Sequence, residues 1–157
     1  MAWSAGRTAS APPGSNARRL DPEDRAEVAD FVRRYPDRLT TGYPALDLSR
    51  DVAWGSFDGD RLVGLARAPV RLPSVWVIGG IFVAPTDRGR GHGRLLTRAA
   101  VGAALSVGAR PALYVRESNY GARRLYEDLG FRPVDRRVWI DFPRPAPSPP
   151  KADRPAS

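Results

Sequence analysis

The residues best suited to chemistry form one loop rich in glycine and arginine, Arg88-Gly89-Arg90-Gly91-His92-Gly93-Arg94. The loop follows the apolar stretch Val75–Val83 and opens a segment in which apolar residues recur at helical spacing. Unpaired N–H groups at the start of a helix bind anions, and glycines let a ligand approach the backbone closely. Arginine side chains add charge-assisted hydrogen bonds to phosphate oxygens. The loop therefore predicts a phosphate-binding site.

The spacing within this loop excludes two common phosphate-binding motifs. No Gly-Lys-Ser/Thr follows it, as a Walker A loop requires, and its third glycine comes two residues after the second instead of three, as in dinucleotide-binding proteins. Residues 86–124 hold eight arginines against two acids, a net charge of +6 out of +8 for the chain. This clustering favours a compact polyanionic ligand over a long duplex. We expect no nucleic-acid partner, and a basic nucleic-acid-binding protein remains a less favoured alternative.

Composition excludes several other kinds of site. The 157 residues include no cysteine and one histidine, His92, which excludes thiolate metal sites, multi-histidine metal sites and a complete hydrolase triad. We therefore expect no metal. The longest apolar run, 75–84, is shorter than the roughly 18 residues that span a bilayer, and no signal sequence opens the chain. These features predict a cytoplasmic protein with no membrane partner.

The elements around the loop predict an α/β domain. A helix is expected from Asp21, its N-cap, to Pro36, and a short strand over 16–20 precedes it. Further strands are expected over 52–57, 61–70, 75–83, 112–115 and 133–142, and further helices over 90–107 and 119–129. The pair Gly79-Gly80 indicates a bulge or a ligand close to the backbone. This order is typical of helices that cross between the strands of one sheet.

The ends of the chain differ in composition from its middle. Residues 1–15 are rich in alanine, serine, glycine and proline, and residues 143–157 are rich in proline. Both compositions predict disorder, so we expect one folded domain over residues 16–142.

Two motifs resemble the signature of the GNAT-fold N-acetyltransferases. Arg88-x-x-Gly91-x-Gly93, after Ile81-Phe82-Val83-Ala84-Pro85 and before Leu95-Leu96, resembles the family's acyl-CoA motif. Asn119-x-x-Ala122-x-x-Leu125-Tyr126-x-x-x-Gly130-Phe131 resembles the second half of the family pattern. The resemblance covers residues 52–142 well and 16–50 only loosely. It implies a mixed, mostly antiparallel sheet of about six or seven strands flanked by helices, with a splayed central strand pair.

The resemblance also implies a reaction and a set of site residues. The reaction is direct attack of an amine on the thioester of acetyl-CoA, the co-substrate, within a ternary complex. The pantetheine arm is expected on the backbone of Ile81, Phe82 and Val83, and the pyrophosphate on Arg88, Gly89, Arg90, Gly91, His92, Gly93 and Arg94. Asn119 either contacts the cofactor or only caps its helix. Tyr126 is either the general acid that protonates the leaving thiolate or a core residue.

The general base is the missing part of this pattern. Many relatives have a glutamate on the strand that corresponds to residues 75–83, and this sequence has no acid from Ser74 to Ala84. Glu117 is the nearest candidate for the base. The alternative is that it is a solvated surface side chain. No base is needed if a chain of water molecules removes the proton of the amine or if the amine arrives partly neutral.

The acceptor is an unidentified amine. Its pocket is expected from residues 37–50, the turn 58–60 and the last strands, where Asp47, Asp51 and Asp58 either attract a cation or are solvated. A non-catalytic acyl-CoA-binding or interaction module of the same fold stays open as an alternative. The resemblance also makes a homodimer possible.

Overall fold

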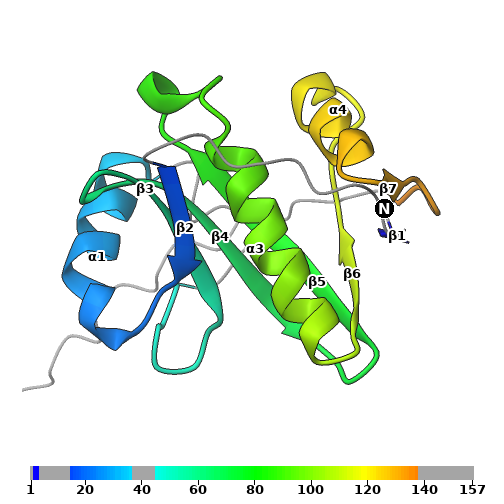
Figure 1. The fold of residues 1–157 in the computed structure, drawn as a ribbon, viewed down its shortest axis with the longest axis horizontal. Coiled ribbons are helices and arrows are strands. Elements are labelled where there is room, and N and C mark those ends of the chain that lie inside the picture. Colours follow the sequence, from blue (N-terminus) through cyan, green and yellow to red (C-terminus); the bar gives the residue numbers. More distant parts are fainter. Residues whose placement is uncertain (1, 4–14, 37–44, 138–157) are drawn as a thin grey trace, which may run out of the picture.

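The fold is a single seven-stranded sheet with helices on both faces, seen in a computed structural model that describes residues 2–3, 15–36 and 45–137 (Figure 1). The strands follow the order β2-β3-β4-β5-β6-β1-β7. Only β5 and β6 run parallel to each other, and the other pairs are antiparallel. The mixed sheet flanked by helices is therefore confirmed.

The strands and helices have the following bounds. The strands are β1 (Ala2–Trp3), β2 (Ser15–Arg19), β3 (Ala53–Asp58), β4 (Arg61–Arg71), β5 (Val75–Val83), β6 (Arg110–Leu113) and β7 (Phe131–Arg132). The α-helices are α1 (Arg25–Arg34), α3 (His92–Ser106) and α4 (Tyr120–Asp128), and two short 3-10 helices are η1 (Pro22–Asp24) and η2 (Pro85–Asp87).

Local sequence explains where the first helical segment begins. The carboxylate of Asp21 accepts a hydrogen bond from the Glu23 N–H, and that of Asp24 accepts one from the Asp21 N–H, both at 2.9 Å. These two bonds satisfy donors that a helix start leaves unpaired. The predicted single helix is in fact the 3-10 turn η1 followed by α1, which ends at Arg34.

The sheet separates two hydrophobic cores. Successive residues of a strand point to opposite faces, so Ala53 packs with α1 and its neighbour Trp54 with α3. The core on the α3 face includes Trp54, Ala66, Ile78, Leu96, Leu113, Tyr126 and Phe131. The core on the α1 face includes Leu20, Val28, Phe31, Ala53, Phe57, Leu62 and Leu65.

A bulge in β5 changes which face its residues reach. Ile78 and Ile81 are three positions apart, yet both pack toward the α3 face. An extra residue must lie between them, and the pairing with β4 shifts register there. Gly80 has a φ of +57°, a left-handed conformation that favours glycine. The predicted bulge at Gly79-Gly80 is therefore present, and beyond it Phe82 packs toward the α1 face.

The two ends of the described sheet differ from our expectations. Ala2–Trp3 forms β1, antiparallel to both β6 and β7, and Ser15 opens β2, although residues 1–15 are predicted to be disordered. The last strand in the described ranges is β7 at Phe131–Arg132, and residues 133–137 form no strand. The remainder of the predicted 133–142 strands lies outside the described residues. A strand of two residues is too short to show an alternating pattern in the sequence. Only its pairing with distant strands defines it.

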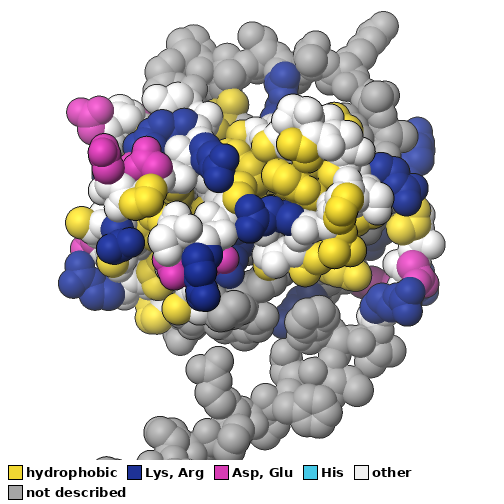
Figure 2. All heavy atoms as spheres, turned by 90° about the horizontal axis from the view of Figure 1, so that it is seen from below, with side chains coloured by type: hydrophobic (Ala, Val, Ile, Leu, Met, Phe, Trp, Pro, Cys, Tyr) yellow, Lys and Arg dark blue, Asp and Glu magenta, His cyan; other side chains and the backbone are white. Residues whose placement is uncertain are grey.

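One end of the molecule carries exposed apolar side chains. Figure 2 views the end where α3 finishes and β4 turns into β5, and hydrophobic and arginine side chains gather on that face. Leu72 and Val107 are more than half exposed. This surface lies at the opposite end of α3 from the glycine-rich loop (Figure 1). The homodimer itself stays a prediction.

Candidate active site

The sheet opens between its two parallel strands. β5 and β6 pair over four positions, from Val75 with Arg110 to Ile78 with Leu113. β5 then continues to Val83 paired with β4, and in the described part of the chain no strand pairs with residues 79–83 on the β6 side. Backbone groups on that side of the strand can therefore bind a ligand. This is the expected splayed pair, and it places Ile81, Phe82 and Val83 along the opening.

The glycine-rich loop joins the end of β5 to the start of α3. Gly89 and Gly91 have φ values of +76° and +87°, and Gly91 is the N-cap residue of α3. A left-handed N-cap brings the chain into the helix by a turn that a side chain would strain. The N–H groups of the first helical turn have no partner inside the helix, so they are available to bind an anion at the end of the opening.

Three elements meet at Gly93. A Cβ atom on Gly93 would lie 3.4 Å from Leu125 Cδ2 of α4 and 3.9 Å from Val83 Cγ2 of β5. The first turn of α3 therefore lies against both the strand and the helix that border the opening. The two sequence motifs, which are separated by 25 residues between Gly93 and Asn119, come together here.

Each arginine of the loop has a contact within the protein. Arg88 Nε donates to the Val83 carbonyl at 3.1 Å, and its guanidinium lies 5.6 Å from the centre of the Phe82 ring. Arg90 approaches Asp58 at 3.3 Å, and Arg94 donates to Asp128 at 3.0 Å. These are exposed or half-buried contacts, which a phosphate can replace at small cost.

A buried carboxylate anchors the start of the loop. Asp87 is 1% exposed and accepts two hydrogen bonds from the Arg61 guanidinium, at 2.8 and 3.0 Å. These bonds hold the pKa of the Asp87 carboxyl below its usual range, against the opposing effect of burial. Thr86 Oγ1 donates a third bond at 3.0 Å. Our sequence reasoning missed Asp87 and Arg61. The only signal in the sequence was that Asp87 is an acid directly before the basic loop.

His92 points into the protein. Its side chain is 2% exposed, and its Nδ1 lies 2.8 Å from Ser56 Oγ of β3. The imidazole is therefore an internal link between α3 and the sheet, and its backbone is the part that lies in the loop.

Tyr126 and Asn119 lie on α4. Tyr126 is 7% exposed and packs edge-on to Phe131, with ring centres 5.9 Å apart. Asn119 is the N-cap residue of α4, and its Oδ1 accepts from the Ala122 N–H at 3.2 Å. The capping role of Asn119 is thus present. Contact of Asn119 or Tyr126 with the cofactor stays a prediction.

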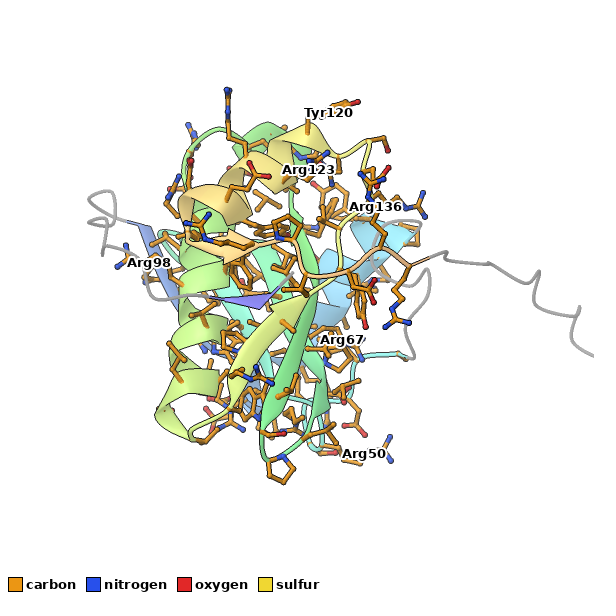
Figure 3. All side chains as sticks on the ribbon, turned by 90° about the vertical axis from the view of Figure 1, so that its right-hand side faces the viewer. Arg50, Arg67, Arg98, Tyr120, Arg123 and Arg136 are labelled. Carbon is orange, nitrogen blue, oxygen red and sulfur yellow. The ribbon has the colours of Figure 1, made fainter. Side chains whose placement is uncertain are left out.

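The acids considered for the base and the acceptor pocket are all in ion pairs. Glu117 is exposed and pairs at 3.0 Å with Arg136, which is labelled in Figure 3. Asp51 approaches Arg67 at 3.6 Å, and Figure 3 shows Arg67 on the side of the sheet away from α3. Arg67 is a buried cation that our sequence reasoning missed, because one arginine in a strand carries no distinguishing signal.

Asp47 and Asp58 have local roles. Hydrogen bonds from Ser49 lower the pKa of Asp47. Asp58 contacts Arg61 and Arg90 and so lies beside the glycine-rich loop. The contribution of the turn 58–60 to the acceptor pocket stays a prediction. Residues 37–44 of the expected pocket lie outside the described residues.

Metal-binding clusters and membrane-spanning helices are both absent from the described ranges. Within them, no group of three or more histidines, acids or cysteines is arranged to hold a metal ion. No helix among those residues has the length and apolar character needed to cross a membrane.

Comparisons with known proteins agree with this geometry. Residues 19–131 match the sequence profile of the acetyltransferase (GNAT) family. No curated protein sequence gives a significant match. An aminoglycoside acetyltransferase from an uncultured soil metagenomic sample, solved with trehalose, has a TM-score of 0.68 and 14% identity over 83% of this chain and 97% of its own.

Two further solved structures share the fold. A GNAT-family protein from Novosphingobium aromaticivorans has a TM-score of 0.63 and 29% identity over 83% of this chain, and the match spans 57% of that protein. A predicted acetyltransferase from Clostridium acetobutylicum, solved with acetyl-CoA, has a TM-score of 0.56 and 18% identity over 81% of this chain and 96% of its own. The matches below 25% identity show that the fold is shared.

Proposed function

The chain belongs to the GNAT family of acetyltransferases, and on that premise we propose that it transfers the acetyl group of acetyl-CoA to a primary amine by direct attack. One observation carries this proposal. β5 loses its parallel partner after Ile78 and ends beside the start of α3, so an extended strand edge leads directly to an anion site. A thioester on a long arm that ends in phosphates matches that sequence of features.

The loop residues support the phosphate end of this proposal. The N–H groups that open α3 and the guanidinium groups of Arg88, Arg90 and Arg94 would bind the pyrophosphate. Gly89 and Gly91 keep side chains away from the backbone there. The pantetheine arm would lie along Ile81, Phe82 and Val83, where it would replace the missing strand with backbone hydrogen bonds.

The chain would make two contributions to the chemistry. Acetyl-CoA supplies an acyl carbon with a thiolate leaving group, so the N–C bond forms as the C–S bond breaks. Backbone N–H groups near Phe82 and Val83 would stabilise the negative charge that develops on the carbonyl oxygen. Tyr126 would give its phenolic proton to the departing sulfur, and the attacking nitrogen would lose a proton to water.

The amine proton has no assigned base. Residues 74–84 contain no acid, and Glu117 and Asp51 are both in ion pairs. We therefore propose that the acceptor binds partly neutral or loses its proton to water, so the rate should rise with pH until the amine is deprotonated. The acceptor itself is a primary amine whose identity needs a screen, in which aminoglycosides are included because one structural relative acetylates them.

Calorimetric titration with acetyl-CoA tests the cofactor part. The double variant Arg88→Ala, Gly91→Glu should lose binding, because it removes a loop cation and adds a carboxylate to the anion site. Arg98→Ala is the matched control, since Figure 3 shows Arg98 on the outer side of α3. Equal binding by all three proteins, or none by the unchanged chain, would overturn the cofactor assignment.

A second experiment separates the enzyme from a non-catalytic module that only binds acyl-CoA. The absence of an acid from Ser74 to Ala84 is compatible with the module, so this alternative must be tested. Release of free thiol from acetyl-CoA is measured with a panel of amines, amino sugars, polyamines and peptides. Amine-dependent thiol release supports the acetyltransferase, and tight binding without release for the whole panel supports the module.

A further inference from the structure

Four charged side chains connect the glycine-rich loop to the β3–β4 hairpin, and we call them the ion cluster. Asp58 and Arg61 come from the hairpin, Asp87 directly precedes the loop, and Arg90 lies in the loop. Arg61 of the hairpin and Asp87 lie 26 positions apart in the sequence. The ion cluster therefore connects the start of the loop to the hairpin.

The two carboxylates of the ion cluster are bound very differently. Asp87 has a side chain that is 2% exposed, and Arg61 holds it with two short hydrogen bonds. Asp58 is 46% exposed and contacts Arg90 at 3.3 Å and Arg61 at 3.4 Å, through the same oxygen. Two short hydrogen bonds fix the position of Asp87. The longer contacts of Asp58 leave its arginine partners free to bind another anion instead.

Arg90 is the movable member of the ion cluster. Its side chain is 60% exposed, and its two contacts, 3.3 Å to Asp58 and 3.6 Å to Asp87, are long. It lies between Gly89 and Gly91, directly before α3. A phosphate bound at that helix start offers Arg90 more charge than the half-exposed Asp58 carboxylate does.

We propose that Asp87 positions the phosphate loop and that Asp58 competes with the phosphates of CoA for Arg90. The inference depends on the proposed function, because it takes the loop to be the site of those phosphates. It gives two nearby carboxylates opposite effects on cofactor affinity. Neutralising Asp87 frees the start of the loop and weakens binding, and neutralising Asp58 releases Arg90 and strengthens binding.

The experiment is a calorimetric titration of the full chain with CoA. Asp87→Asn should weaken binding about tenfold, because the half-exposed Arg61 guanidinium loses its buried counter-charge and the loop loses its anchor. Asp58→Asn should tighten binding by up to about fivefold, the worth of one exposed ion pair. Asp60→Asn is the matched control, because Asp60 is exposed on the same turn and reports the effect of net charge alone.

Two additions separate this mechanism from general damage to the fold. In an Arg90→Gln background the Asp58→Asn substitution should no longer tighten binding, since the competed group is gone. If Asp87→Asn does not fold, Arg61→Lys replaces it, because lysine keeps the charge and loses the two-pronged bond. Destabilisation alone cannot produce tighter binding, so the increased CoA affinity expected of Asp58→Asn is the decisive result.

Specific results would overturn the proposal. They are an Asp58→Asn affinity no higher than that of Asp60→Asn, a gain that persists without Arg90, or unchanged CoA binding in both Asp87→Asn and Arg61→Lys. Absence of CoA binding by the unchanged chain would remove the proposed function, and this inference with it. Binding by the unchanged chain without these differences would remove only the inference.

Discussion

Ser56 Oγ and His92 Nδ1 lie 2.8 Å apart in the protein interior, where they join β3 to the first turn of α3. Ser56 Oγ also donates to the Asn16 carbonyl of β2 at 3.2 Å. Three elements are thus connected through one hydroxyl group. Because the helix start is the expected anion site, this internal bond sets the direction in which its N–H groups point.

The Ser56–His92 bond should contribute to stability. Ser56→Ala should lower the free energy of unfolding by about 1–3 kcal/mol, because a buried imidazole nitrogen loses its partner. His92→Ala should cost more, about 2–4 kcal/mol, since it also leaves a cavity. Urea denaturation measures both variants and the double variant. If the two residues interact as the geometry indicates, the double variant loses less than the sum, and additive losses would contradict the bond.

Gly91 and Gly93 should respond in opposite directions to alanine. Gly91 has a φ of +87°, so Gly91→Ala should destabilise the fold by about 1–2 kcal/mol. Gly93 lies inside α3, where an added Cβ meets only ordinary contacts, so Gly93→Ala should stabilise it by up to about 1 kcal/mol. Urea denaturation of the two variants checks both signs.

The same Gly93→Ala variant also tests the site. Its methyl group would enter the place where β5, α3 and α4 meet, beside Val83 and Leu125. We expect acetyl-CoA affinity to fall although stability rises. Unchanged affinity would mean that the cofactor does not pass Gly93, and Gly102→Ala, in open space on the same helix, is the control.

Much of this site follows from local sequence. The glycines at 91, 108 and 130 all have positive φ values at helix ends, and the Gly79-Gly80 pair marks the bulge in β5. These features depend on backbone conformations that few residues adopt, so the sequence alone predicts them. The capping alternative for Asn119 follows for a similar reason, because amides favour that position.

The remaining features depend on distant partners. The sequence has eight arginines in residues 86–124. It does not show that Asp87 pairs with Arg61 or that Asp58 pairs with Arg90, because those partners lie 26 and 32 positions apart. The two-residue strand β1 shows no alternation and exists only through β6 and β7. The burial of His92 likewise depends on Ser56, 36 residues away.

Acid should destabilise the fold through carboxylates that are bound in the native state. Bidentate arginine partners lower the pKa of Asp87 (Arg61) and of Asp24 (Arg18) in the folded protein. A lowered folded pKa gives stability that is fully present above the unfolded value, about 4, and is lost as the pH falls toward the folded value. We therefore expect a melting temperature that is level from pH 7 to 5 and falls below pH 4.

Single variants assign this acid transition. Asp87→Asn and Asp24→Asn should each be less stable at pH 7 and lose less stability between pH 5 and 3 than the unchanged chain, because each lacks one titrating group. Unfolding is followed by circular dichroism at each pH. An unchanged slope in both variants would place the transition in other groups.

Tyr126 offers the test that best separates catalysis from packing. Its ring packs against Phe131, and Tyr126→Phe keeps that contact while removing the hydroxyl group. If the phenol protonates the departing sulfur, kcat should fall by about 10²–10⁴-fold, the usual range for a general acid. The dissociation constant for acetyl-CoA should change little, because the proton moves only in the transition state.

Stability and a matched variant complete the argument for Tyr126. Tyr126→Phe should change the free energy of unfolding by less than about 1.5 kcal/mol, the worth of one hydrogen bond. Phe131→Leu, which loosens the ring contact and keeps the phenol, should lower stability more and kcat less. The ratio of the two effects decides the role, because a core residue loses stability first and an acid loses turnover first. A Tyr126→Phe enzyme with undiminished kcat would make Tyr126 a packing residue and leave the leaving thiolate to take its proton from water.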